Sequence, residues 1–184
     1  MVEIVALVIS GLSLLVAGIG TYQANKRANE ALAASRDAAV DARWFAVQEA
    51  VQRLIGFDPM AQPVGERLQN LRITMIALVD QLEGWDGIDS WLDAERTLGA
   101  TISRQVMEVS EQGETVEQRV KNLEPLMSWA HVLSSNLRRF RSTGHNATVL
   151  AELQANAEAV VRSIHERHRW ELPPSTNPRV RPLN

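Results

Sequence analysis

The chain has 184 residues and a formal net charge of −3. This acidic balance argues against a general nucleic-acid binder, which usually carries a basic face. The chain has no cysteine, which excludes disulfides and thiolate metal sites.

The first predicted element is a transmembrane anchor over residues 1–22. No charged side chain occurs between Glu3 and Gln23, and the segment is apolar on every face of a helix. Such a helix is buried in a large core or in lipid. At 1.5 Å per residue it reaches roughly 31 Å, about one hydrocarbon thickness. The predicted anchor side chains are Ile4, Leu7, Val8, Leu12, Leu15 and Ile19.

A cleaved signal peptide is the alternative for this segment. Signal peptides begin with a basic region and end in a cleavage site of small residues. Here the first charged residue is Glu3, and residues 18–21 make a weak cleavage site. Lys26 and Arg27 follow the span directly, so the positive-inside rule places the N-terminus outside and the rest in the cytoplasm. The chain is therefore predicted to be a single-pass protein of the cell membrane.

Residues 23–55 are predicted to continue the same helix as a stalk. This stretch is rich in alanine, the best helix former, and contains neither proline nor glycine. Small residues recur at alternating spacings of four and three, which is typical of a coiled coil. The stretch is either a self-associating stalk or simply a stable solvated helix. The residues predicted to self-associate, here named the alanine seam, are Ala24, Ala28, Ala31, Ala38 and Ala42.

Residues 56–171 are predicted to form an up-down helical bundle. Apolar stripes with helical spacing predict helices over 64–83, 88–112, 115–141 and 147–170, separated by glycine-containing turns. The stalk enters this bundle from Val40 onward, giving four to five helices. No segment alternates with a period of two, so the predicted class is all-α. The last residues, 172–184, are predicted to be a disordered, proline-rich tail.

Local signals place the helix starts. Thr115 and Gln118 fit a capping box, and Asn146 fits the N-cap of the last helix. The apolar stripe keeps one phase across Pro125, which predicts one kinked helix there rather than two helices. The stripe residues predicted to point inward include Val109, Val116, Val120, Met127 and Val160.

Metal binding is not predicted. His165 and His168 are three positions apart, whereas the zincin pattern needs four, and no third ligand is evident. Glu95 falls near an inward position of its helix, but no histidine follows it at the spacing of a di-metal site. No cofactor is predicted, and catalysis finds no support because no nucleophile motif or phosphate-binding loop is present.

Two surface features are candidates for contact with a partner or with lipid. Arg138, Arg139 and Arg141 form the sharpest basic cluster, which either binds anionic head groups or offsets a helix dipole. Trp85 lies in a glycine-rich turn and is either an exposed binding residue or folded back over the end of the bundle.

Three functions are compatible with this pattern. The first is a non-enzymatic, membrane-anchored scaffold that binds other proteins and copies of itself. The second is a sensor that binds a small ligand between helices, for which Gln105 and Ser134 are polar residues near inward positions. The third is a lysis or pore-forming protein, which needs several copies to line a channel.

Overall fold

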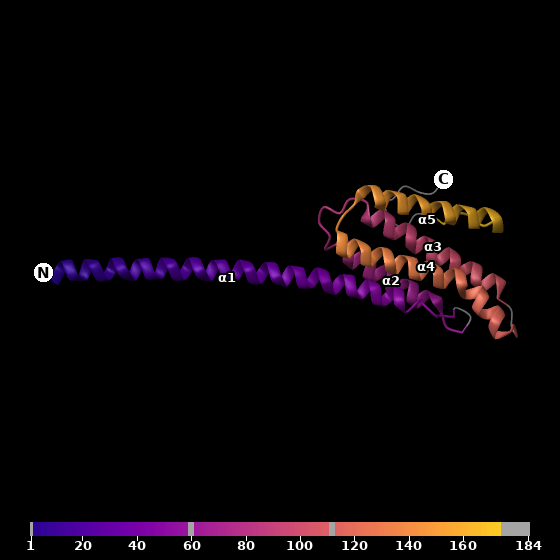
Figure 1. Ribbon diagram of the computed structural model, residues 1–184, viewed down its shortest axis with the longest axis horizontal. Helices are drawn as coiled ribbons and strands as arrows, with labels where there is room; N and C mark the ends of the chain where they lie inside the picture. Colours follow the sequence, from indigo (N-terminus) through magenta and orange to yellow (C-terminus); the bar gives the residue numbers. More distant parts are fainter. Residues whose placement is uncertain (1, 59–60, 111–112, 174–184) are drawn as a thin grey trace. The chain divides into compact units, whose positions relative to one another are not determined.

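A computed structural model describes the backbone of residues 2–58, 61–110 and 113–173, and the side chains of these residues from Tyr22 onward. Its helices are α1 (Val2–Gln52), α2 (Val64–Val79), α3 (Ile88–Val109), α4 (Val116–Thr143) and α5 (Ala147–His168). Figure 1 shows their order along the chain. These described residues contain no strand, so the predicted all-α class is confirmed for them.

The chain divides into two compact units, Met1–Asp41 and Ala42–Asn184. The described part of the first unit is one helix, the N-terminal part of α1. Every residue from 22 to 39 in it is exposed. The predicted stalk, residues 23–55, is helical as far as Gln52, where α1 ends. Its alanine content favours this conformation.

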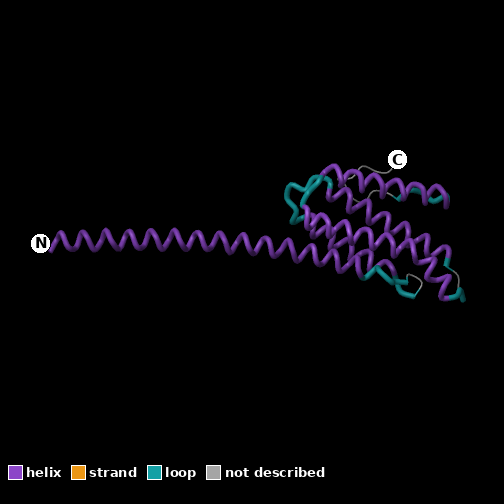
Figure 2. Tube along the Cα trace, viewed as in Figure 1, coloured by secondary structure: helices purple, strands orange, loops and turns teal. Residues whose placement is uncertain are grey.

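The second unit is a helical bundle made by the end of α1 and by α2–α5. Figure 2 shows α2–α5 lying side by side, with loops at alternate ends. Helix α3 contacts α2, α4 and α5, which places it at the centre of the bundle. This is the predicted helical bundle. It arises because each helix has an apolar stripe to bury, and short turns between the helices make neighbours antiparallel. Its largest fully buried side chains are Trp91, Leu54, Leu71, Leu78, Leu126, Leu133, Leu137 and Leu150.

Helix α2 ends at Val79, four residues before the predicted end at 83. The residues that follow form successive tight turns, in which Gln81 N–H donates to the Leu78 carbonyl at 3.0 Å. Gly84 and Gly87 then take the left-handed φ values of 75° and 89°. Glycine adopts this conformation at little steric cost, so the chain reverses here into α3.

The predicted N-caps Thr115 and Asn146 are confirmed, whereas the side chain of Gln118, the second member of the predicted capping box, donates to Asn122 Oδ1 at 3.0 Å. Thr115 Oγ1 accepts the Gln118 N–H at 3.2 Å, and Asn146 Oδ1 accepts the Val149 N–H at 3.1 Å. Helix α4 runs as one element with Pro125 inside it, as the unbroken stripe predicts.

Helix α5 ends at His168, two residues before the predicted end. Arg169 takes a left-handed φ of 56°. Its N–H donates to the Glu166 carbonyl at 3.2 Å, and the Trp170 N–H donates to the His165 carbonyl at 2.9 Å. These two bonds define a Schellman motif, with arginine at the position where glycine is usual.

Four residues predicted to point inward are exposed. Val116 and Val120 are 77% and 54% exposed, because the core of α4 begins only at Leu123. Val109 lies in the last turn of α3 and is also exposed. On α5 the buried residue is Val161 rather than Val160, since a 3.6-residue helix drifts against a strict heptad.

A similar shift by one residue occurs on α4. Leu126 is fully buried there, whereas Met127 is half-buried. Residues 174–184 of the predicted tail lie outside the described part of the chain.

Candidate functional site

The alanine seam lies in an uncovered helix. All five of its alanines are exposed, and Lys26 and Glu30 form a short-range charge contact between them at 3.9 Å. An exposed helix of this length has little tertiary packing to stabilise it, and most helices in proteins depend on such packing. A face of small side chains is available for close approach by another helix.

The side chains of the predicted anchor lie outside the described residues. The backbone there is helical, as part of α1. Among the residues whose side chains the structure describes, no helix is both long and apolar enough to cross a membrane. The predicted anchor residues whose side chains lie outside the described part are Ile4, Leu7, Val8, Leu12, Leu15 and Ile19.

A carboxylate is buried in the centre of the bundle. Glu95, on α3, is 5% exposed. Its Oε1 accepts the indole N–H of Trp91 on the same helix at 3.0 Å. Its Oε2 accepts the indole N–H of Trp129 on α4 at 2.9 Å. The two tryptophans therefore satisfy one oxygen each, and the carboxylate joins α3 to α4.

The six-membered ring of Trp129 lies against α3 at Gly99. A Cβ atom on Gly99 would lie 2.3 Å from the Cη2 atom of Trp129, well inside van der Waals contact. Ser103 Oγ also donates to the Gly99 carbonyl at 2.8 Å. Glycine in a helix interior is destabilising by about 0.5–1 kcal/mol relative to alanine. Its presence here follows from the space that the indole needs.

Burial raises the pKa of Glu95 above its usual value. Desolvation is the largest cause, and the hydrogen bonds from Trp129 and Trp91 act in the opposite direction. Removing a carboxylate from water disfavours its charged form, while N–H donors favour it. The burial effect is the stronger of the two here.

A second polar group links α3 to α5. His165 is 5% exposed, and its Nε2 lies 3.2 Å from Thr101 Oγ1. Its Nδ1 donates to the Glu171 carbonyl at 2.7 Å, because a carbonyl can only accept. Thr101 therefore donates to Nε2 when the ring is neutral. His165 is therefore a core residue.

The two histidines considered for metal binding both lie against the ring of Trp170, but their polar partners differ. His168 stacks on Trp170 with ring centroids 4.5 Å apart, and its Nδ1 lies 3.6 Å from Glu108. The guanidinium of Arg104 covers Trp170 at 3.9 Å from the ring centroid. In the described residues, no three histidine, aspartate or glutamate side chains gather in a way that could hold a metal ion.

Trp85 folds back over the end of the bundle and is half-buried there. Its ring centroid lies 5.7 Å from that of Trp44 and 5.6 Å from that of His145. The ring of Phe140 lies 6.4 Å away. This is the second of the two interpretations of Trp85 given above, and it makes the residue part of an aromatic cluster that closes this end.

The three arginines of the basic cluster on α4 differ in their exposure. Arg138 and Arg139 are exposed, whereas Arg141 is half-buried and covers the ring of Phe45 at 4.2 Å. Arg141 therefore supports packing between α1 and α4, and the two neighbouring arginines remain accessible to solvent.

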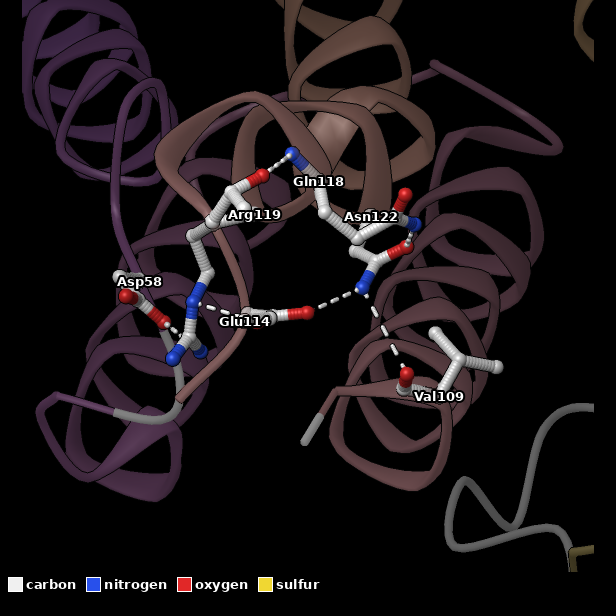
Figure 3. A network of polar contacts seen from close by, with 7 residues as sticks. Asp58, Val109, Glu114, Gln118, Arg119 and Asn122 are labelled. Atoms are coloured by element: carbon white, nitrogen blue, oxygen red, sulfur yellow. Dashed lines mark hydrogen bonds and ion pairs between the residues drawn. The ribbon is translucent and has the colours of Figure 1, made fainter. Parts of the chain in front are cut away.

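A polar network ties the loops at one end of the bundle together (Figure 3). Arg119 lies between two carboxylates, with Nη1 at 3.4 Å from Asp58 and Nε at 2.6 Å from Glu114. Asn122 donates to the other oxygen of Glu114 at 2.7 Å and approaches the Val109 carbonyl at 3.5 Å. The network joins the α1–α2 loop, the α3–α4 loop and the first turns of α4.

Gln105 and Ser134, the two polar residues that suggested a ligand site between helices, differ in their burial. Ser134 is buried, but Gln105 is only half-buried. The buried groups Glu95, Thr101 and His165 bond to neighbouring side chains, as described above. These bonds stabilise the packing of α3 against its neighbours.

Comparison of the chain with protein-family models, with curated proteins and with solved structures gives no match in any of the three. The chemistry of the chain therefore carries the functional argument alone.

The spacing of two residues on α3 is a sequence signal for the central carboxylate. Glu95 interrupts an apolar stripe, and Trp91 lies one helical turn before it. Trp129, the second tryptophan bonded to Glu95, lies 34 positions from it in the sequence. Its pairing with Glu95 depends on how α4 is rotated against α3.

Proposed function

We propose that this chain is a single-pass, membrane-anchored scaffold that acts through protein–protein contacts and associates with copies of itself. The observation that carries the proposal is the run of exposed helix from 22 to 39, which contains most of the alanine seam. A long helix without packing partners gains stability when a second helix covers its face.

The sequence of α1 before residue 22 supports a membrane anchor. It has no charge between Glu3 and Gln23, and its length matches a bilayer. With Lys26 and Arg27 directly after it, the bundle is proposed to lie on the cytoplasmic side.

Anchoring also determines how two copies would meet. Copies inserted in the same direction run parallel, so each seam residue faces its own counterpart across a two-fold axis. Small side chains let the two backbones approach closely, which supports association through packing rather than through charge.

A crosslinking experiment tests this arrangement, because the chain has no cysteine of its own. Ala31→Cys places a thiol on the seam, and Ala33→Cys places one on the opposite face of the same helix as a matched control. A disulfide forms only when the two Cα atoms lie within about 7 Å. Oxidation in native membranes is expected to give a covalent dimer with the first variant and not with the second. Equal crosslinking of the two, or none with either, would contradict the proposed seam.

The same control variant tests the orientation. In intact cells, Ala33→Cys is expected to resist a membrane-impermeant maleimide and to react after lysis. Labelling before lysis would place the helix on the outer side. Recovery of the intact chain in the soluble fraction would contradict the anchor itself.

A further inference from the structure

Glu95 is a buried titratable side chain that the proposed self-association does not use. Its two oxygens accept one hydrogen bond each, from Trp91 and from Trp129. An indole N–H is a neutral donor, so it satisfies an oxygen without neutralising a charge. A buried carboxylate held only in this way keeps a large part of its desolvation penalty.

The charged groups near this carboxylate are paired with other residues. Asp93 and Arg96, on either side of it along α3, lie 2.9 Å apart. Helix α5 brings the buried His165, which bonds to Thr101 further along α3.

The other helices of the bundle contribute few polar groups to its interior. The half-buried pair Glu158–Arg162 of α5 has its charged atoms 3.8 Å apart. The buried side chains of α2 are apolar, the bundle part of α1 adds the buried amide nitrogen of Gln48, and those of α4 are apolar except for Ser134 and the indole N–H of Trp129.

We propose that Glu95 and its two indoles form a proton-linked clasp between α3 and α4, which holds more tightly when the carboxyl group carries a proton. In the protonated form the cost of burying a charge disappears. The carboxyl group can still accept a hydrogen bond from an indole through its carbonyl oxygen. The contribution of Glu95 to the stability of the bundle therefore increases on acidification.

The direction follows from the linkage between proton binding and folding. The folded-state pKa of Glu95 is raised above its usual value of 4.5. A group of this kind contributes stability that is fully present below its unfolded pKa and is lost as the pH rises through its folded pKa. Between those two values, the unfolding equilibrium constant changes by up to about tenfold per pH unit.

Thermal unfolding of the full-length chain in mild detergent tests the clasp. The melting profile of the wild type is compared with that of Glu95→Gln, which removes the titration, from about pH 5 to about pH 8. Glu152→Gln serves as the control, because it neutralises an exposed carboxylate on α5. On acidification, the wild type and the control are expected to gain stability relative to Glu95→Gln. Parallel profiles for all three, or a relative loss by the wild type, would overturn the proposal.

A second measurement applies if Glu95→Gln fails to fold. A carbon NMR titration of the Glu95 carboxyl group follows the proton directly in the wild type and in Trp129→Phe. Removing one donor is expected to move the titration to higher pH, because the charged form loses a hydrogen bond. A Glu95 carboxyl that titrates together with the surface glutamates, or that does not respond to the loss of Trp129, would refute a clasp governed by this proton.

Discussion

Replacing Gly99 by alanine is expected to destabilise the bundle strongly, although alanine is the better helix former. The new Cβ atom would lie 2.3, 2.5 and 2.9 Å from three ring atoms of Trp129. That ring cannot easily move aside, since it is buried and its N–H is bonded to Glu95 at 2.9 Å.

The size of the effect combines three contributions. Overpacking of a core costs about 1–3 kcal/mol. Displacing Trp129 also breaks a hydrogen bond to a carboxylate, worth about 1.5–3 kcal/mol. The gain in helix propensity returns about 0.5–1 kcal/mol. The net loss is roughly 1.5–5.5 kcal/mol. For a chain of this length each kcal/mol lowers the melting temperature by about 2–4 °C.

Thermal and urea unfolding followed by circular dichroism measure this loss. Gly65→Ala is the matched control, because this glycine lies in the first turn of α2 with no atom within 4 Å of the added Cβ. It is expected to be neutral or slightly stabilising. The double variant Gly99→Ala with Trp129→Leu should recover part of the loss. If Gly99→Ala is as stable as the wild type, the indole does not occupy this position and the assignment of the clasp is wrong.

Three further substitutions test other parts of the bundle. Arg119→Met leaves the carboxylate of Glu114, whose side chain is 6% exposed, without its cation, so urea unfolding should show a loss of about 1–3 kcal/mol; an unchanged midpoint would contradict the network. Asn146→Ala removes the N-cap of α5 and should lower stability by about 1 kcal/mol in the same assay, and a loss much below this would mean that the cap bond is not maintained in solution. Arg169→Gly should raise the melting temperature, because it relieves a left-handed φ of 56°. Its control, Arg167→Gly, lies inside the last turn of α5 and should lower the melting temperature.

The fold could be predicted because its signals are local. Five apolar stripes, the caps at Thr115 and Asn146 and the glycines of the turns each act within a few residues. Some errors occurred at helix ends, where the periodic apolar pattern continues beyond the buried core. Val116 and Val120 continue the phase of the α4 stripe, yet the first buried residue of that stripe is Leu123.

The central carboxylate could be predicted only in part. The position of Glu95 near the inward face follows from spacing, but its partner Trp129 does not, because the two residues belong to different helices. Pairing between helices depends on their rotation and offset, which single-sequence periodicity does not define. Gly99 carried a further signal that a large side chain packs against α3 there, since a glycine inside a helix otherwise only weakens the helix.

The uncovered helix from 22 to 39 has a consequence for how the chain can be observed. Backbone amides in a helix that is exposed on all sides open to water at a small fraction of the global unfolding energy. These amides should therefore exchange their hydrogens with solvent long before those of α3. A protein that binds this helix would slow the exchange over these residues alone, so the exchange pattern would reveal both the binding and its place before the partner is identified.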